Sequence, residues 1–156
     1  MISNPILIVD DEVEMRIAIS ETLKHCGYPV DLSHNAIDAL KKFKENDYSM
    51  VITDMTMPKR SGLELLKDIK SLDPGKPVIM ATAYGTVPTA VEAMKHGAFD
   101  YITKPIEFET LSFLVERALD FKGHTGTMVP LEEAKPVKGR VAETSKEIVT
   151  QNKEML

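Results

Sequence analysis

Short apolar runs alternate along the chain with segments in which apolar residues recur every three or four positions. Such runs occupy residues 6–9, 50–53, 78–81 and 99–103, and residues 28–33 form a further strand-like segment. Apolar runs of four to eight residues between turn residues are typical of β-strands. The runs at 6–9 and 78–81 contain no polar residue, which is typical of parallel strands covered on both faces.

The intervening segments carry the 3.6-residue period of amphipathic helices. Five helices are predicted, and their apolar or small faces begin at Met15, Ala36, Leu65, Val87 and Leu111. The face that begins at Val87 continues with Ala90, Val91 and Met94, which are therefore expected to be buried. Glycine or proline follows several of these faces closely, as is common where helices end.

This alternation predicts an α/β fold of five βα units, with a parallel sheet, right-handed crossovers and helices on both faces. Pro29 cannot donate a hydrogen bond to a neighbouring strand, so the second strand is predicted at a sheet edge. An edge position there fits the flavodoxin-like order 2-1-3-4-5. The repeating pattern fills residues 1–122 and fails beyond them. Residues 123–156 are predicted to contain a linker, and the family resemblance described below implies that they also contain the start of a following domain.

Polar residues stand where four of the predicted strands end. The Asp10–Asp11 pair follows the first strand, Asp54 the third, Thr82 the fourth and Lys104 the fifth. The carboxyl ends of parallel strands share one edge of a sheet, and open α/β sheets bind ligands there. Clustered acids beside a hydroxyl and an ammonium group indicate a divalent metal with a phosphoryl group next to it.

Composition restricts the function classes. The 156 residues suggest one domain plus a tail, and 43% apolar with 28% charged residues is ordinary for a soluble globular protein. The net charge of −5, without a basic stripe, argues against direct nucleic-acid binding. Cys26 is the only cysteine, so it excludes an internal disulfide, and its place on a helix face predicts a core position. No signal peptide or membrane-spanning run is found, so a cytoplasmic location without membrane contact is expected.

Four segments, in this order, resemble the receiver domain of two-component response regulators: IVDDE at 8–12, TDMTMPKRSG at 53–62, ATAYG at 81–85 and GAFDYITKPI at 97–106. The resemblance covers about residues 4–122 and implies the CheY-like form of the fold. From Thr82 onward the chain is most similar to receivers of the NtrC class, which precede an AAA+ ATPase domain that activates sigma-54 RNA polymerase. The resemblance therefore implies a phosphoacceptor regulatory domain rather than an enzyme with its own substrate.

The resemblance also implies roles for the acids. Asp54 matches the aspartate that accepts a phosphoryl group from a sensor histidine kinase. Asp10, Asp11, Asp54 and the backbone carbonyl of Thr56 match the ligands of Mg²⁺. Judged without the resemblance, Asp10 and Asp11 fit equally well as acids favoured by the dipole at a helix N-terminus.

Three further residues match the family's switch. Lys104 is expected to contact the phosphoryl group and to precede a cis peptide bond to Pro105. Thr82 is the expected switch hydroxyl and Tyr101 the switch aromatic, with a homodimer formed through residues 86–122. Considered alone, Lys104 would be a surface lysine and Tyr101 a half-buried strand tyrosine.

Other function classes fit less well. A stand-alone, chemotaxis-type receiver that acts by binding another protein is the main alternative, and the tail beyond residue 122 argues against it. A phosphatase of the haloacid dehalogenase type needs a DxDx[TV] pattern, which the sequences after Asp10 and Asp54 both lack. An FMN-binding flavodoxin needs a Ser/Thr/Gly-rich loop after the first strand, and none is present.

Overall fold

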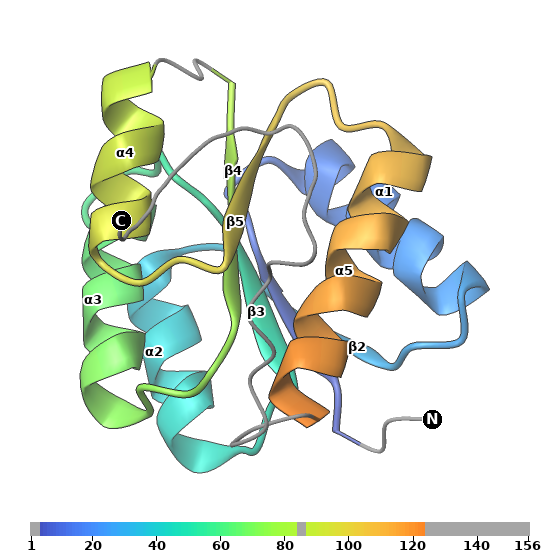
Figure 1. The fold of residues 1–156 in the computed structure, drawn as a ribbon, viewed down its shortest axis with the longest axis horizontal. Helices are drawn as coiled ribbons and strands as arrows, with labels where there is room; N and C mark the ends of the chain where they lie inside the picture. The colour runs from blue at the N-terminus through green and yellow to red at the C-terminus, as the bar shows by residue number, and fades with distance from the viewer. Residues whose placement is uncertain (1–3, 84–86, 124–156) are drawn as a thin grey trace, which may run out of the picture. The chain divides into compact units, whose positions relative to one another are not determined.

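The computed structural model describes residues 4–83 and 87–123 (Figure 1). Its strands are β1 (Ile6–Val9), β2 (Val30–Ser33), β3 (Met50–Asp54), β4 (Val78–Thr82) and β5 (Asp100–Thr103). Its helices are α1 (Val13–His25), α2 (Ala36–Glu45), α3 (Gly62–Leu72), α4 (Val87–Lys95) and α5 (Phe108–Gly123). The predicted linker and following domain lie outside the described residues, apart from Gly123 at the end of α5.

The five strands form one parallel sheet in the order β2-β1-β3-β4-β5, which confirms the predicted fold class and topology. The strand predicted from residue 28 begins at Val30, so Pro29 precedes it rather than lying within it. The carbonyl of Pro29 accepts a hydrogen bond from the Ile6 N–H at 2.9 Å. The Pro29 carbonyl therefore takes part in the pairing with β1. The missing N–H of Pro29 removes no hydrogen bond within β2, because the strand begins after it.

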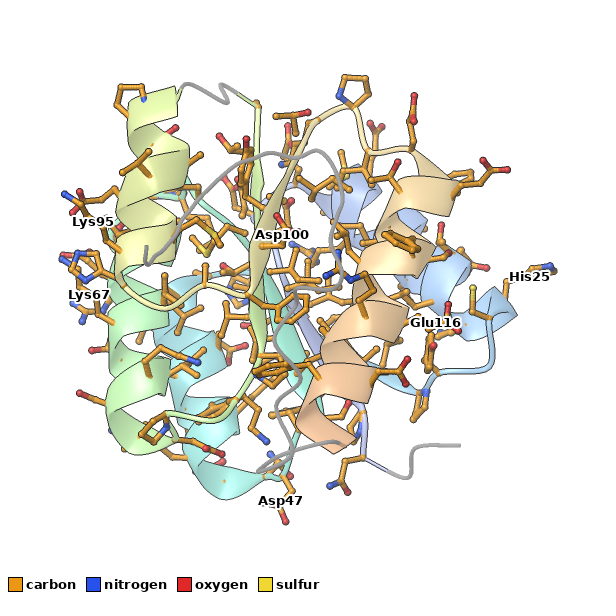
Figure 2. All side chains as sticks on the ribbon, in the orientation of Figure 1. His25, Asp47, Lys67, Lys95, Asp100 and Glu116 are labelled. Carbon is orange, nitrogen blue, oxygen red and sulfur yellow. The ribbon has the colours of Figure 1, made fainter. Side chains whose placement is uncertain are left out.

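The helices cover both faces of the sheet. Figure 1 shows α1 and α5 on one face and α2, α3 and α4 on the other. Side chains alternate between the faces along each strand. In β1, Ile6 and Ile8 pack towards α1 and α5, while Leu7 and Val9 pack towards the other layer. Charged side chains labelled in Figure 2, such as Lys67 on α3 and Lys95 on α4, point away from the sheet.

Three predicted core positions are exposed. Val91 and Met94 were expected on the buried face of α4, yet they are 46% and 44% exposed, whereas Ala90 and Ala93 are buried. Small side chains let a helix lie close to the layer beneath it, and the helical period alone does not say which of two adjacent faces turns inward. The core position predicted for Cys26 is also wrong, because Cys26 follows the last residue of α1 and is exposed.

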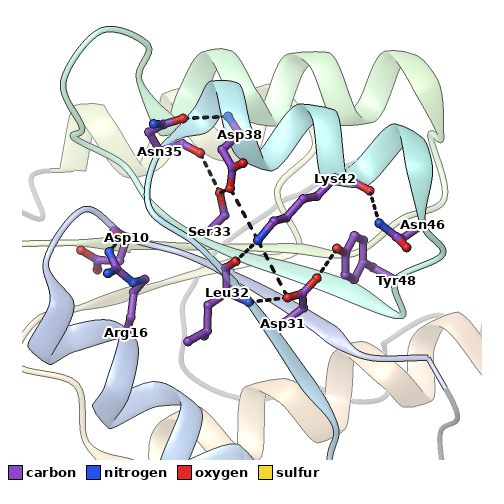
Figure 3. Close-up of polar contacts among 10 residues, drawn as sticks. All are labelled: Asp10, Arg16, Asp31, Leu32, Ser33, Asn35, Asp38, Lys42, Asn46 and Tyr48. Carbon is purple, nitrogen blue, oxygen red and sulfur yellow. Dashed lines mark hydrogen bonds and ion pairs between the residues drawn. The ribbon is translucent and has the colours of Figure 1, made fainter.

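Side chains close the free edge of β2 (Figure 3). The Leu32 N–H donates to the Asp31 carboxylate at 2.9 Å, and the Lys42 ammonium donates to the Leu32 carbonyl. Tyr48, only 1% exposed, donates its phenol O–H to the same Asp31 carboxylate at 2.6 Å. Burial and this hydrogen bond raise the pKa of Tyr48 well above its ordinary value. The outward N–H and carbonyl of Leu32 are thereby occupied, which helps to protect this edge strand against pairing with another chain.

Replacing Tyr48 by phenylalanine should lower the free energy of unfolding by about 1–2 kcal/mol, because Asp31 loses a donor in a partly buried position. Urea denaturation would measure this loss. Tyr101→Phe is the matched control, since that ring is 40% exposed, and its effect should stay within about 0.5 kcal/mol. Equal effects of the two substitutions would contradict a stabilising role for the Tyr48 hydrogen bond.

Within the described residues, no helix combines the length and the apolar character needed to cross a membrane.

Candidate functional site

Strand register brings the acids together at the carboxyl edge of the sheet. Val9 lies opposite Thr53, so the next residues, Asp10 and Asp54, extend the neighbouring strands β1 and β3 at the same level. Backbone hydrogen bonds to the next strands hold both acids in place. The Asp10 N–H donates to the Ser33 carbonyl, and the N–H of Met55, which follows Asp54, donates to the Ala81 carbonyl. The strand order, which places β1 beside β3, therefore decides which acids become neighbours once the sheet forms.

Three carboxylates form one cluster. Asp10, Asp11 and Asp54 each offer an oxygen, and these oxygens lie within 4.8 Å of one another. Asp10 and Asp54 are 1% and 6% exposed, whereas Asp11 is exposed to solvent. The cluster thus has two buried acids beneath one that faces solvent.

Lys104 reaches this cluster from the far end of the chain. Thr103 lies opposite Thr82, and the Lys104 N–H continues the ladder to the Thr82 carbonyl at 2.9 Å. Its ammonium nitrogen Nζ lies 3.0 Å from Asp10 Oδ2 and 3.4 Å from Asp54 Oδ2. The Lys104 side chain is 9% exposed, so it is not a surface lysine. The peptide bond from Lys104 to Pro105 is cis, as the resemblance implied.

Burial and charge shift the titration of both central groups. Burial raises the pKa of the Asp54 carboxyl and the nearby Asp10 charge adds to the rise, whereas Lys104 opposes it. Burial by itself would lower the pKa of Lys104, but its hydrogen bond to Asp10 and the Asp54 charge outweigh burial and raise it. The site is therefore electrostatically unfavourable for an ionised Asp54 until a further cation shares its charge.

The turn after β3 contacts the second oxygen of the Asp54 carboxylate. The Thr56 N–H donates to Asp54 Oδ1 at 3.4 Å, a long hydrogen bond. Helix α3 then begins at Gly62, preceded by a capping box in which Ser61 and Glu64 exchange hydrogen bonds. The ligand role of the Thr56 carbonyl remains a prediction.

The two expected switch residues lie on neighbouring strands. Thr82 ends β4 and is 5% exposed, and Tyr101 pairs with Met80 in the middle of β5 and is 40% exposed. Both residues therefore belong to the part of the sheet beside α4. Their roles in switching stay predictions.

Sequence reasoning missed three residues of the site. The Glu12 carboxylate lies 3.4 Å from the Lys104 ammonium, and the Arg16 guanidinium donates to the Asp10 carbonyl at 2.6 Å (Figure 3). Gly62 lies so close to Asp54 that a Cβ there would be 1.9 Å from the Asp54 carbonyl oxygen. Glu12 is the third consecutive acid after β1 in the sequence, but no sequence pattern links it to Lys104, which lies 92 residues away.

The donor set fits a hard divalent cation. Three carboxylates within one small cluster supply only oxygen ligands, which Mg²⁺ and Ca²⁺ prefer, and within the described residues neither histidine nor cysteine joins them. The cluster also retains an open side, since Asp11 is exposed. A metal bound there would lie beside the buried Asp54 carboxylate and the Lys104 ammonium group.

Comparisons with known proteins agree with this geometry. The family model of the response regulator receiver domain matches residues 6–116. The transcriptional regulatory protein ZraR of Salmonella typhimurium is 39% identical over 129 residues, which cover 83% of this chain and 29% of that protein. The chain thus spans less than a third of the length of this relative.

Solved structures show the same fold. A receiver domain from Clostridium thermocellum has a TM-score of 0.74 and 36% identity, covering 78% of this chain and 98% of that one. The beryllofluoride-activated NtrC4 receiver domain dimer has a TM-score of 0.73 and 32% identity, covering 76% of this chain and 98% of that one. With an acid cluster and a buried lysine at the carboxyl edge of a sheet ordered 2-1-3-4-5, and with a family model that matches most of its length, the chain belongs to the response regulator receiver domain family.

Proposed function

We propose that the domain is a phosphorylation-dependent switch in which Asp54 accepts a phosphoryl group from the phosphohistidine of a sensor histidine kinase. The observation that carries this proposal is the position of the Lys104 ammonium, 3.4 Å from Asp54 and 3.0 Å from Asp10. A buried carboxylate beside a buried ammonium group supplies a nucleophile and a partner for the charge that arrives with the phosphoryl group.

In the proposed transfer, an Asp54 carboxylate oxygen attacks phosphorus. The bond between phosphorus and the kinase imidazole breaks, its electron pair passes to the imidazole nitrogen, and an acyl phosphate forms on Asp54. The Lys104 ammonium binds an oxygen of the transferring group and neutralises part of its charge. Asp54 needs no general base because it attacks in its ionised form.

Magnesium is the proposed cofactor, held by Asp10, Asp11, Asp54 and the carbonyl of Thr56. When bound, it supplies positive charge beside Asp54 and polarises the phosphoryl oxygens. The acid cluster supports this assignment through its all-oxygen donors. Arg16 holds the backbone of Asp10 in place from α1.

The proposed response begins at Thr82. Its hydroxyl bonds a phosphoryl oxygen once Asp54 is modified, and Tyr101 moves inward as Thr82 moves. New contacts of Thr82 and Lys104 with the phosphoryl group exist only in the modified state, and this difference biases the equilibrium between two conformations. The proposed output is sigma-54-dependent transcription activation in the cytoplasm, supported by the similarity to the NtrC4 receiver and to longer transcriptional regulators.

The direct test is the intact mass of the chain after incubation with acetyl phosphate and Mg²⁺. The expected result is a gain of one phosphoryl group that disappears in Asp54→Ala and when the metal is chelated. Asp47→Ala is the control, because Asp47 is exposed and lies outside the site (Figure 2). A gain that persists in Asp54→Ala would refute Asp54 as the acceptor.

Activation should produce a homodimer through residues 86–122. Within the described part of that range, Val91, Met94 and Tyr101 form an exposed apolar set on α4 and β5. Light scattering after addition of beryllofluoride and Mg²⁺ should show a dimer mass, and Val91→Glu should weaken association by about 2 kcal/mol. Ile37→Glu, which changes an exposed apolar residue on α2, should leave association unchanged. Monomeric masses with and without activation would contradict this prediction.

A further inference from the structure

We propose that Glu12 is a positioning residue of the site, which competes with an incoming phosphoryl group for the Lys104 ammonium and thereby sets how strongly that group is held. This inference rests on the proposed function. It assigns to Glu12 a role that acts through Lys104, without contact between Glu12 and the reacting atoms.

The Lys104 ammonium contacts three carboxylates. It makes hydrogen bonds to Asp10 at 3.0 Å and to Glu12 at 3.4 Å, while Asp54 forms an ion pair at 3.4 Å. An ammonium group has only three donors. Three carboxylates therefore surround three donors, and a phosphoryl oxygen can obtain a donor from Lys104 only when one of these contacts is given up.

Exposure identifies which contact yields. The side chains of Asp10 and Asp54 are 1% and 7% exposed, whereas the side chain of Glu12 is 65% exposed. Separating an exposed carboxylate from its partner costs little because water replaces the lost hydrogen bond. Glu12 is thus the carboxylate that a phosphoryl oxygen would displace.

Within the described residues, the Glu12 side chain makes no hydrogen bond or ion pair besides its contact with Lys104. Glu12 is the N-cap of α1, but its side chain makes no capping hydrogen bond, and its own N–H is satisfied by Asp10 Oδ1 at 2.9 Å. Serine, threonine, aspartate and asparagine are the usual capping residues. The Glu12 side chain instead extends from the helix terminus to Lys104.

Neutralising Glu12 should therefore tighten binding of a phosphoryl analogue. Glu12→Gln keeps the length of the side chain and removes the charge that attracts Lys104 and repels an anion. With saturating Mg²⁺, a ¹⁹F NMR titration should show tighter beryllofluoride binding by about two- to five-fold, the size expected for one solvent-exposed charge interaction. Glu14→Gln is the matched control, since Glu14 is an exposed acid on the first turn of the same helix, and it should leave the affinity unchanged.

A second measurement follows Lys104 itself. The ¹⁵N signal of the Lys104 ammonium, recorded without metal or analogue, should move in Glu12→Gln and stay in place in Glu14→Gln. Glu12→Asp keeps the charge but shortens the side chain. Its affinity for beryllofluoride should rise only if its Lys104 ¹⁵N signal also moves. An unmoved signal in Glu12→Gln, or equal changes of affinity in Glu12→Gln and Glu14→Gln, would overturn the inference.

Failure of the proposed function gives a different result. If the unaltered chain binds no beryllofluoride in the presence of Mg²⁺, the phosphoryl site itself is refuted and the role of Glu12 falls with it. If the unaltered chain binds beryllofluoride but Glu12→Gln binds it with the same affinity, only the role of Glu12 is refuted.

Discussion

Replacing Gly62 by alanine should destabilise the domain by about 3 kcal/mol and lower phosphoryl uptake by about two orders of magnitude. A Cβ at this position would lie 1.9 Å from the Asp54 carbonyl oxygen and 2.9 Å from both the Asp54 carbonyl carbon and Met55 Cα. All three neighbours are backbone atoms, so no side chain can rotate away to make room.

The clash lies directly beneath the proposed nucleophile. The Gly62 N–H donates to the Met55 carbonyl at 2.9 Å, and the capping box at Ser61 fixes where α3 begins. Relief of the clash therefore requires a shift of α3 or of the residues that position Asp54. A displacement of about 1 Å at a reacting group is enough to cost a hundred-fold in rate.

Gly75→Ala provides the control for Gly62→Ala. A Cβ at Gly75 would meet only the Asp73 carboxylate, at an ordinary contact distance of 3.7 Å. Its free energy of unfolding should change by less than about 1 kcal/mol. Urea denaturation and the rate of mass gain with acetyl phosphate would measure the two effects, and similar values for the two variants would refute the steric role of Gly62.

Asp54→Asn should stabilise the metal-free domain by about 1–2 kcal/mol, although it removes the residue on which the proposed function depends. Burial and the neighbouring Asp10 charge raise the pKa of Asp54, so its ionised form is disfavoured in the folded state. An asparagine of the same shape carries no charge and relieves that cost. Thermal unfolding in EDTA should accordingly give a Tm that is higher by several degrees.

The pH dependence of this gain has a definite sign. Because the pKa of Asp54 is higher in the folded than in the unfolded state, folding binds a proton between the two values, and stability decreases as the pH rises through that range. Below the unfolded pKa, near 3.8, both chains are neutral at this position and the Tm difference should vanish. The difference should grow with pH and become constant above the raised pKa.

Magnesium should reverse the order of stability. A cation bound among Asp10, Asp11 and Asp54 stabilises the folded chain by about 2.7 kcal/mol at one hundred times its dissociation constant, and Asp54→Asn loses a ligand. Asp47→Asn, at an exposed position outside the cluster, should match the unaltered chain in both solutions. A lower Tm of Asp54→Asn in EDTA would contradict the electrostatic account of the site.

The sequence predicted most of the fold and the acids of the site. The apolar runs and the 3.6-residue period were sufficient for the five βα units, because each element buries a face that its own residues define. The strand order required the additional observation of Pro29 and the family resemblance. The acids at 10, 11 and 54 were identified from their positions at the ends of predicted strands, because parallel strands end at a common edge of the sheet.

Local patterns failed for Val91 and Met94 on α4 and for Cys26 after α1. Val91 and Met94 satisfied the helical period of α4, yet the alanines beside them turn inward, because the space beneath the helix decides the buried face. Cys26 continued the period of α1, but the helix ends one residue earlier.

Local sequence thus determined the elements, their order along the chain and the chemical types gathered at one edge of the sheet. Only the tertiary structure decided that Glu12 shares the Lys104 ammonium, that Arg16 holds Asp10 and that Gly62 has no room for a side chain. Periodicity is a property of neighbours in the chain, whereas these contacts join residues whose separation is fixed only when the sheet and its helices pack together.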